Sequence, residues 1–395
     1  MIHRDATDTL LTLMRGFPIV TLTGPRQSGK TTLARTALGH KPYLSLEDPD
    51  ERRLALDDPR GFLNRFPDGA VLDEVQRAPE LLSYLQTRVD ADGRMGLFLL
   101  TGSQQLGLMS GITQSLAGRT GFIELLPLSV GELQRAGRVP PSLDETLVTG
   151  GYPALFDRPL APRTWLGAYV TAYLERDLRQ LLKVQELDTF QRFLQLCAGR
   201  SGQLLNLSAL ATDAGITHNT AKAWISVLEA SYILFLLRPH HANFRKRVVK
   251  SPKLYFLDAG LLCWLLGIQA PDQLKTHPLR GSIFETFVVS ELLKTRYNQG
   301  ERTGLHFWRD SNGLEVDVLA EAGTRLMPIE IKSGQTLNRD FFQGLERWQS
   351  LAGDLAAPPV LIYGGTGNLR HNGTRVLAWD QAHLALLDPD TSGPA

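Results

Sequence analysis

Residues 24–31 read Gly24-Pro25-Arg26-Gln27-Ser28-Gly29-Lys30-Thr31, which fits the spacing G-x-x-x-x-G-K-[ST]. An apolar segment, Ile19–Leu22, comes directly before this stretch, and Thr32 continues it into a helical pattern. In that context the glycines let backbone N–H groups turn around an anion, and the helix N-terminus adds its dipole. We therefore expect residues 24–32 to bind a nucleotide, with Lys30 on the β- and γ-phosphates and the Thr31 hydroxyl on Mg²⁺.

A pair of carboxylates follows the apolar segment Gly69–Leu72, where a strand of the same sheet is expected to end. Asp73 suits coordination of Mg²⁺, either directly or through a water molecule. Glu74 suits polarising the attacking water, because a carboxylate beside the γ-phosphate can accept its proton. Glu74 and Lys30 are therefore expected to be the catalytic residues of ATP hydrolysis to ADP and phosphate.

Three further polar residues show weaker patterns. The segment Phe98–Thr101 is expected to be the next strand, and Ser103 or Gln104 just beyond it could orient water and sense the γ-phosphate. Arg119 precedes the last strand expected in this part of the chain. It is either an arginine finger that contacts the nucleotide of a neighbouring subunit or an ordinary surface arginine.

The composition narrows the classes of protein to which the chain can belong. At about 100–200 residues per domain, 395 residues correspond to roughly two to four domains. Hydrophobic residues make up 43% and charged residues 21%, which excludes disorder, collagen and coiled coil as descriptions of the whole chain. The formal net charge of +1 excludes a globally basic coat protein, so a nucleic-acid site would have to be a local patch.

The cysteines and the most apolar stretch indicate the cellular compartment in which the protein is expected. Cys197 and Cys263 cannot form a framework of several disulfides, which favours a reducing cytoplasm. The stretch Leu254–Ile268 contains Asp258 and is too short to span a bilayer, and no long apolar region follows Met1. We therefore expect a cytoplasmic protein that has no membrane contact.

The pattern of apolar residues divides the chain into three expected domains. Residues 1–150 alternate apolar runs with amphipathic stretches, which predicts a parallel α/β sheet. Residues 151–275 are predicted to be mainly helical, with helices over 161–182 and 189–198. Residues 276–395 return to a small α/β domain, beginning with a helix over 283–293. The strands expected in the first and third domains are Pro18–Thr23, Tyr43–Leu46, Ala70–Leu72, Leu97–Thr101, Phe122–Leu125, Leu305–Trp308, Glu315–Ala320 and Met327–Lys332.

The middle domain contains the pattern of a helix-turn-helix. Residues 207–216 read as a short helix that ends at Gly215, and residues 217–228 read as a second helix capped by Thr217 or a near neighbour. His218, Asn219 and Lys222 would then be exposed near the N-terminal end of the second helix, where a recognition helix touches bases.

A basic run follows the expected strand Ile233–Leu237, and no acidic residue lies between His240 and Lys253. It could be the wing of a winged helix that grips phosphates. The alternative is a module used as a spacer or for subunit contacts, with the basic run in solvent. The members of the run are Arg245, Lys246, Arg247, Lys250 and Lys253.

Two expected strands near the C-terminus carry an acidic pattern. Asp317 lies on the first, and Glu330 and Lys332, two residues apart and so on one face, lie on the second. Two carboxylates can hold Mg²⁺ while a lysine orients water against a phosphodiester, and Glu285 on the preceding helix could be a fourth member. The pattern resembles the PD-(D/E)xK nucleases, although Val316 stands where their proline would be. A nuclease fold used only for binding, or an ordinary pair of charged strands, are the alternatives.

Several of these segments together resemble a family of prokaryotic AAA+ ATPases that carry a C-terminal domain of unknown function, number 4143. The resemblance covers nearly the whole chain. It implies ATP binding and an AAA+ sheet, followed by a winged helix and a nuclease-like fold. The segments are Gly24–Thr31, Val71–Arg77, Thr101–Gln105, Gly118-Arg119, Leu126–Ser129 and Gly150–Pro153.

The sequence thus predicts an ATP- and Mg²⁺-dependent ATPase whose output is remodelling of, or movement on, branched or duplex DNA. A homo-oligomer such as a ring is expected, because residues of the Arg119 type act on a neighbouring subunit's nucleotide. Two alternatives stay open. One is a nucleotide-gated DNA-binding regulator that turns over slowly, and the other is a metal-dependent nuclease with ATP as a switch.

Overall fold

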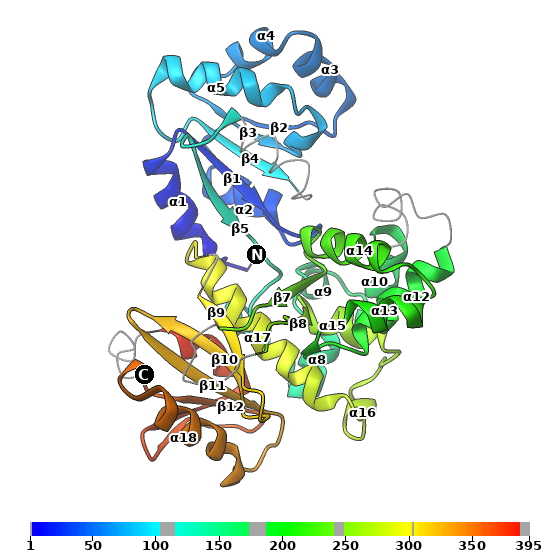
Figure 1. The fold of residues 1–395 in the computed structure, drawn as a ribbon. Helices are drawn as coiled ribbons and strands as arrows, with labels where there is room; N and C mark the ends of the chain where they lie inside the picture. Colours follow the sequence, from blue (N-terminus) through cyan, green and yellow to red (C-terminus); the bar gives the residue numbers. More distant parts are fainter. Residues whose placement is uncertain (1, 103–114, 174–186, 241–248, 302–303, 388–395) are drawn as a thin grey trace. The chain divides into compact units, whose positions relative to one another are not determined.

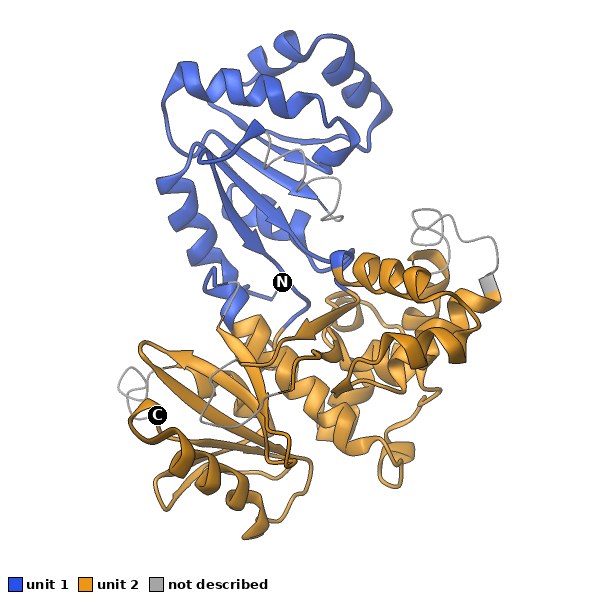
Figure 2. Cartoon of the chain, viewed as in Figure 1, with its two compact units in different colours: residues 1–128, 230–232, 296–302 blue, residues 129–229, 233–295, 303–395 orange. Residues whose placement is uncertain are grey.

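The computed structural model describes residues 2–102, 115–173, 187–240, 249–301 and 304–387 (Figure 1). These residues form two compact units (Figure 2). Unit 1 contains residues 1–128 together with the short segments 230–232 and 296–302, and unit 2 contains the rest. A compact unit can hold more than one sequence domain, so the division into 1–150, 151–275 and 276–395 stays a prediction.

Unit 1 is built on a parallel sheet of five strands in the order β2-β3-β4-β1-β5 (Figure 1). The sheet confirms the predicted α/β fold and each predicted strand to within two residues. Helices cover both faces of such a sheet, which is why its strands read as continuous apolar runs. The strands are β1 (Ile19–Thr23), β2 (Tyr43–Ser45), β3 (Ala70–Asp73), β4 (Phe98–Gly102) and β5 (Thr120–Glu124).

The helices of unit 1 pack in two separate hydrophobic cores, one on each face of the sheet. Leu10 and Leu33 belong to one core, and Phe62 and Leu85 belong to the other. Asp48 and Asp58 cap two of the helices with their side chains, and a proline occupies the first turn of each. The helices are α1 (Ala6–Gly16), α2 (Lys30–Ala37), α3 (Pro49–Asp57), α4 (Pro59–Asn64), η1 (Val75–Arg77) and α5 (Leu81–Asp92).

The first part of unit 2 is mainly helical, as predicted, and includes a small antiparallel sheet in the order β6-β8-β7. The predicted helix 161–182 begins as α10, and residues 174–182 lie outside the described part of the chain. The elements are α7 (Val130–Arg135), α8 (Leu143–Thr149), α9 (Ala154–Asp157), α10 (Pro162–Tyr169), α12 (Leu187–Ala198), β6 (Gln203–Leu204), α13 (Leu207–Ala214), α14 (His218–Ala230), β7 (Leu234–Leu237), β8 (Lys253–Phe256), α15 (Ala259–Leu265) and α16 (Pro271–Leu274).

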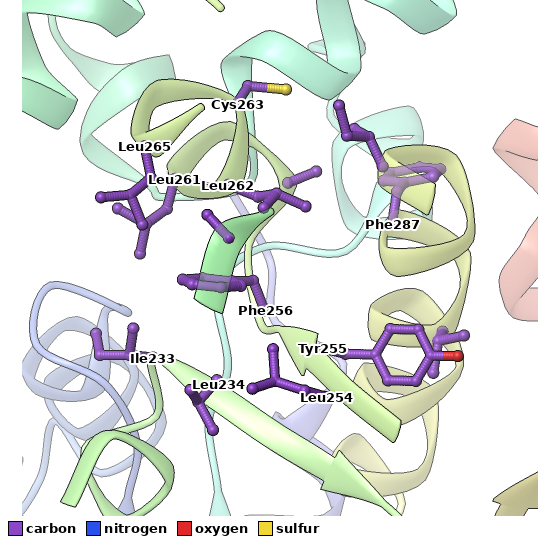
Figure 3. Packing of buried hydrophobic residues seen from close by; sticks show 14 of the residues in the cluster. Ile233, Leu234, Leu254, Tyr255, Phe256, Leu261, Leu262, Cys263, Leu265 and Phe287 are labelled. Atoms are coloured by element: carbon purple, nitrogen blue, oxygen red, sulfur yellow. The ribbon is translucent and has the colours of Figure 1, made fainter. Parts of the chain in front are cut away.

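The helix–glycine–helix prediction over 207–228 is confirmed. Helix α13 ends at Gly215, whose φ of 74° is left-handed, so the chain turns there without the steric cost of a Cβ. Thr217 caps α14, because its hydroxyl accepts a hydrogen bond of 3.1 Å from the backbone N–H of Thr220. Leu261 and Leu265 of α15 belong to the same buried cluster as the β7–β8 hairpin, and Tyr255 of β8 points towards the helix that carries Phe287 (Figure 3).

The second part of unit 2 is a mixed sheet of six strands in the order β13-β14-β12-β11-β10-β9. The predicted strands β9, β10 and β11 are confirmed, and the predicted helix 283–293 extends to 280–298. Strand β12 was not among the predicted strands. It is four apolar residues long, and so short a run has no periodicity that distinguishes a strand from a buried helix. The elements are α17 (Arg280–Asn298), β9 (Leu305–Arg309), β10 (Glu315–Ala322), β11 (Arg325–Lys332), α18 (Asp340–Ala352), η3 (Gly353–Leu355), β12 (Val360–Tyr363), β13 (Leu369–His371), β14 (Thr374–Ala378) and η4 (Trp379–Leu386).

Over the described ranges, none of the helices combines the length and the apolar character that crossing a membrane requires.

Candidate functional site

The loop between β1 and α2 has the backbone shape that its two glycines allow. Gly24 has a φ of 147°, and a Cβ at this position would clash with the carbonyl oxygen of Leu125. Gly29 has a φ of 95° and is the N-cap of α2. No other residue adopts these two conformations without strain, so the spacing of the glycines sets the course of the loop. Arg4 braces the loop from outside by donating hydrogen bonds of 2.7 Å to the Ser28 carbonyl and 2.6 Å to the Leu126 carbonyl.

Lys30 is buried in the first turn of α2 and its ammonium group lies inside the loop. Its Nζ donates hydrogen bonds of 2.9 Å to the carbonyl of Gly24 and 2.7 Å to that of Pro25. Burial lowers the pKa of Lys30 to about 8, while the charges of Glu74 and Asp73 raise it and that of Arg26 lowers it further. A desolvated ammonium satisfied only by neutral carbonyls would be stabilised strongly by an anion in the loop.

Asp73, the last residue of β3, is held by three hydroxyl groups. Thr31 donates a hydrogen bond of 3.1 Å to Oδ2, Tyr43 donates to the same oxygen, and Thr101 donates to Oδ1. Burial and the bond to Asp73 raise the pKa of Tyr43 to about 12, so its phenol remains a donor. The sequence predicted Asp73 and Thr31 but neither Tyr43 nor Thr101 in this role.

Glu74 follows directly and has a left-handed backbone with a φ of 56°. Such a conformation is rare for a residue with a long side chain and is typical of functional sites. Its N–H donates a hydrogen bond of 3.3 Å to the Thr101 hydroxyl, and its carboxylate accepts one from the amide of Gln76. Thr101 therefore contacts both acidic residues and fixes them relative to each other.

These residues fit a nucleotide and Mg²⁺. Within the described residues the Ser28 hydroxyl is buried and has no hydrogen-bond partner, which suits a donor awaiting a phosphate oxygen. The Thr31 hydroxyl and the Asp73 carboxylate lie side by side and supply the oxygen ligands that Mg²⁺ prefers. Lys30 and the backbone N–H groups of residues 24–32 would then hold the phosphates.

The remaining residues predicted for this site are only partly placed. Ser103 and Gln104 lie outside the described residues. Arg119 lies next to the N-terminal end of β5, whereas the loop lies at the C-terminal end of the neighbouring β1. Its guanidinium donates two hydrogen bonds, of 2.5 and 2.8 Å, to the carboxylate of Asp90 in the same chain. A role for Arg119 on a neighbouring subunit stays a prediction.

The residues predicted to contact DNA are exposed where the structure describes them. His218, Asn219 and Lys222 lie exposed on the first part of α14, and Lys250 is exposed before β8. Arg245, Lys246 and Arg247 lie outside the described residues. Including Lys253 in the exposed basic run was wrong, because Lys253 is 3% exposed and its ammonium is directed into unit 2.

Lys253 neutralises part of a carboxylate cluster, which consists of Glu285, Glu315, Asp317 and Glu330. Its Nζ lies 3.0 Å from Oε1 of Glu285 and also forms an ion pair with Glu315. Tyr255, two residues along β8, donates a hydrogen bond of 2.5 Å to the same oxygen of Glu285. Burial and the charge of Asp317 raise the pKa of Glu285 to about 6. The sequence missed Lys253, although its alternation with apolar neighbours in a buried strand was a possible signal.

Asp317, Glu330 and Lys332 meet on β10 and β11, as predicted. Asp317 accepts a hydrogen bond of 2.8 Å from the N–H of Ile331, and Lys332 donates one of 2.5 Å to Glu330. Burial, followed by the charge of Asp317, raises the pKa of Glu330 to about 8. Glu285 interacts electrostatically with both Asp317 and Lys332, so the four predicted residues share one region of unit 2.

The carboxylate cluster is compensated by cations of the chain itself. Lys253 pairs with Glu285 and Glu315. Arg309 also pairs with Glu315, and Lys332 pairs with Glu330. Nowhere in the described ranges do three or more His, Cys, Asp or Glu side chains form a group that could hold a metal ion. The arrangement supports the predicted convergence of residues but gives no support to a cation site there.

Three family models match successive parts of the chain. The model of an AAA domain matches residues 16–134, and the models of two domains of unknown function, DUF8612 and DUF4143, match residues 140–272 and 280–381. Uncharacterised proteins of Mycobacterium bovis and Mycobacterium tuberculosis are each 33% identical to the chain over 339 residues, which is 85% of this chain and 74% of the relative.

Two solved structures have a distant similarity to the chain. A Walker-type ATPase of Pyrococcus abyssi is 16% identical, with a TM-score of 0.42 over 66% of this chain and 94% of its own. The RuvB Holliday junction branch migration motor of Thermotoga maritima is 20% identical, with a TM-score of 0.30 over 60% of this chain and 90% of its own. These likenesses are too distant to add to the assignment, which rests on the matched domains, the mycobacterial relatives and the geometry of the loop.

The AAA domain, the DUF4143 domain and the relatives that match most of the chain lead to one conclusion. The chain belongs to the family of AAA P-loop ATPases that carry a C-terminal DUF4143 domain.

Proposed function

We propose that the chain hydrolyses ATP at the loop between β1 and α2 and uses the hydrolysis to remodel, or to move along, branched or duplex DNA. Membership of the AAA family implies the ATPase activity. The observation that carries the proposal is the network around Asp73, where Thr31, Tyr43 and Thr101 all donate hydrogen bonds to one carboxylate. This network holds an acidic residue in a fixed position beside the phosphate-binding loop.

Each residue of the site has a distinct part in the proposed hydrolysis. Lys30 would leave its two carbonyl partners and bind the β- and γ-phosphates. Glu74 would accept the proton of the attacking water, and Thr101 would hold its backbone in the strained conformation. Thr31 and Asp73 would hold Mg²⁺, whose charge would stabilise the negative charge that develops on the phosphates.

The DNA part of the proposal rests on the exposed beginning of α14. Two helices joined at Gly215 precede the antiparallel hairpin of β7 and β8, which is the chain order of a winged helix. Polar side chains that can reach base edges or phosphates line the first turns of the second helix. They are His218, Asn219 and Lys222.

A homo-oligomer is also part of the proposal. AAA-type ATPases use an arginine of one subunit on the nucleotide of the next, and Arg119 is the candidate. In a single chain Arg119 is paired with Asp90, so its release from that partner would accompany any such contact.

The ATPase rate measured with a panel of nucleic acids tests the proposal. Branched or duplex DNA should raise the rate, and single-stranded DNA and RNA serve as the comparison. Equal rates with every nucleic acid and with none would refute the DNA part while leaving the ATPase assignment intact. A DNA-bound protein whose ATP turnover is not stimulated would indicate the nucleotide-gated regulator instead.

A set of variants then locates the DNA site. Replacing Lys222 by Ala should weaken DNA binding and lower the slope of log affinity against log salt by up to about 0.9, the value for one phosphate contact. Lys275→Ala is the matched control, because Lys275 is an exposed lysine of unit 2 paired with Asp272. Equal slopes for wild type and Lys222→Ala would place the DNA site elsewhere. Replacing Arg245, Lys246 and Arg247 together tests the predicted wing in the same way.

A further inference from the structure

Tyr232 has the most strained backbone of the segment that leaves α14. Its φ of 58° lies in the left-handed region, which an aromatic residue rarely adopts. The N–H of the next residue, Ile233, donates a hydrogen bond of 3.0 Å back to the Leu228 carbonyl, so the end of the helix closes around the strained residue. A conformation of this kind persists only where surrounding contacts hold it, and such contacts concentrate at functional sites.

The contacts that hold Tyr232 are made by its phenol. Its hydroxyl donates a hydrogen bond of 2.8 Å to Oε1 of Glu124 and lies 2.8 Å from the hydroxyl of Thr23. All three residues are buried, with 4%, 4% and 1% exposure for Tyr232, Glu124 and Thr23. Burial and the charge of Glu124 hold the pKa of Tyr232 well above its usual value, so the phenol stays protonated and can donate.

Thr23 and Glu124 are the last residues of β1 and β5, and they pair in register across the two strands. Thr23 immediately precedes Gly24, the first residue of the phosphate-binding loop. Leu125, immediately after Glu124, donates its N–H to the Thr23 carbonyl at 2.8 Å and packs its own carbonyl against Gly24. The phenol of Tyr232 therefore joins the two strand ends from which the loop departs.

The position of Tyr232 in the chain makes this contact unusual. Residues 230–232 belong to unit 1, whereas residues 129–229 before them and 233–295 after them belong to unit 2. Helix α14 thus continues directly into a short segment of unit 1. Tyr232, in that segment, contacts the two strand ends with its own side chain. A shift of the loop on binding phosphates would act on Thr23, then on the Tyr232 phenol, and then on the last turn of α14.

We propose that Tyr232 is a positioning residue that couples nucleotide occupancy of the phosphate-binding loop to the conformation of helix α14. The coupling acts through the hydroxyl, because that group makes the bonds to both strand ends. It does not depend on what α14 binds, so it stands apart from the proposal that the ligand is DNA. By linkage, any ligand that α14 binds selectively in one conformation changes the affinity for nucleotide by the same factor.

Hydrogen exchange of the full chain tests the coupling. Exchange is measured with Mg²⁺ alone and with Mg²⁺ plus saturating amounts of a non-hydrolysable ATP analogue, and protection of residues 19–37 shows that the loop is occupied. In wild type, the amides of 226–233 should change their exchange rate by about fivefold or more, the lower end of common coupling factors. Tyr232→Phe keeps the ring and removes the hydroxyl, and should lose this response while residues 19–37 remain protected.

Four further variants separate coupling from general damage. Glu124→Gln keeps an oxygen that can accept the bond from Tyr232 and should keep the response. Tyr152→Phe removes a different buried tyrosine hydroxyl, bonded to Tyr169 at 3.1 Å, and should also keep it. Should Tyr232→Phe fail to fold, Thr23→Val removes the partner hydroxyl and should lose the response, whereas Thr23→Ser should retain it.

Two results would overturn the proposal. One is a full response of residues 226–233 in Tyr232→Phe, or in Thr23→Val. The other is a wild-type protein in which residues 19–37 are protected by the analogue while residues 226–233 are unchanged.

Discussion

The buried ammonium of Lys30 makes nucleotide binding depend on pH in a way that can be calculated. Its pKa in the free protein is lowered to about 8, chiefly by burial, and the phosphates of a bound nucleotide would raise it. Lys30 is therefore about nine-tenths protonated at pH 7 and about one-tenth protonated at pH 9. Above pH 8 the binding of ATP must be accompanied by uptake of a proton, and the affinity should fall.

The expected fall is about tenfold between pH 7 and pH 9, or about 1.4 kcal/mol, provided that only the ammonium form binds the phosphates. Titration calorimetry with Mg²⁺ and a non-hydrolysable ATP analogue measures both the affinity and, from buffers of different ionisation enthalpy, the number of protons taken up. The uptake should approach one proton at pH 9.

Lys30→Arg is the matched control, because a guanidinium stays charged throughout this range. The ionisation of the nucleotide and of other groups affects both proteins equally, so the difference between them isolates Lys30. A wild-type affinity that varies with pH no more than that of Lys30→Arg would refute the reasoning. It would mean that the ammonium is not desolvated in the free loop.

Three other predictions concern single side chains. Glu74→Gln should bind ATP as wild type does and turn it over about 10²–10⁴ times more slowly, as measured by phosphate release, because it lacks the general base; turnover at the wild-type rate would reject that role. Lys253→Met should lower the free energy of unfolding in urea by about 3–5 kcal/mol, because it leaves buried carboxylates without their cation, whereas the exposed control Lys250→Met should change it by less than about 0.5 kcal/mol. The raised pKa of Glu330 means that the folded state keeps this proton at pH values where the unfolded state has lost it, so the free energy of unfolding of wild type should fall by about 1.4 kcal/mol per pH unit from about pH 4.5 towards pH 8. Glu330→Gln should lack this fall, and parallel pH profiles for the two proteins would contradict the prediction.

The phosphate-binding loop could be predicted from sequence because all of its determinants are local. Two glycines, one lysine and one threonine at fixed spacing specify a backbone path and a donor set, and the apolar run Ile19–Leu22 supplies the strand before it. Asp73 and Glu74 follow the same logic at the end of the next apolar run. The strands of the parallel sheet could be predicted equally well, because a strand that is buried on both faces reads as a continuous apolar run.

What the sequence did not reveal are polar partners brought together by tertiary structure. Tyr43 lies 30 positions from Asp73 along the chain, and its aromatic ring gives no sign that its hydroxyl meets a carboxylate. Lys253 closes a basic run, and composition alone groups it with Arg245 and Lys250 although it is buried among carboxylates. Tyr232 looks like an ordinary strand residue until its φ is known. Such pairings depend on register and packing, which a local pattern does not encode.

The ion pairs of Lys253 have a consequence for the register in which β7 and β8 pair. Lys253 pairs with Leu237 and Tyr255 with Phe235 across the hairpin, and Lys253 and Tyr255 share one face of β8. A slip of one residue would turn both to the other face and set Leu254 and Phe256 against Glu285, so buried carboxylates would face hydrocarbon. The apolar residues of β8 alone would tolerate either alignment nearly equally, because both faces of the strand are buried. Lys253 thus specifies one register of the hairpin, because a shifted register is destabilised by unpaired buried charge rather than by loss of packing.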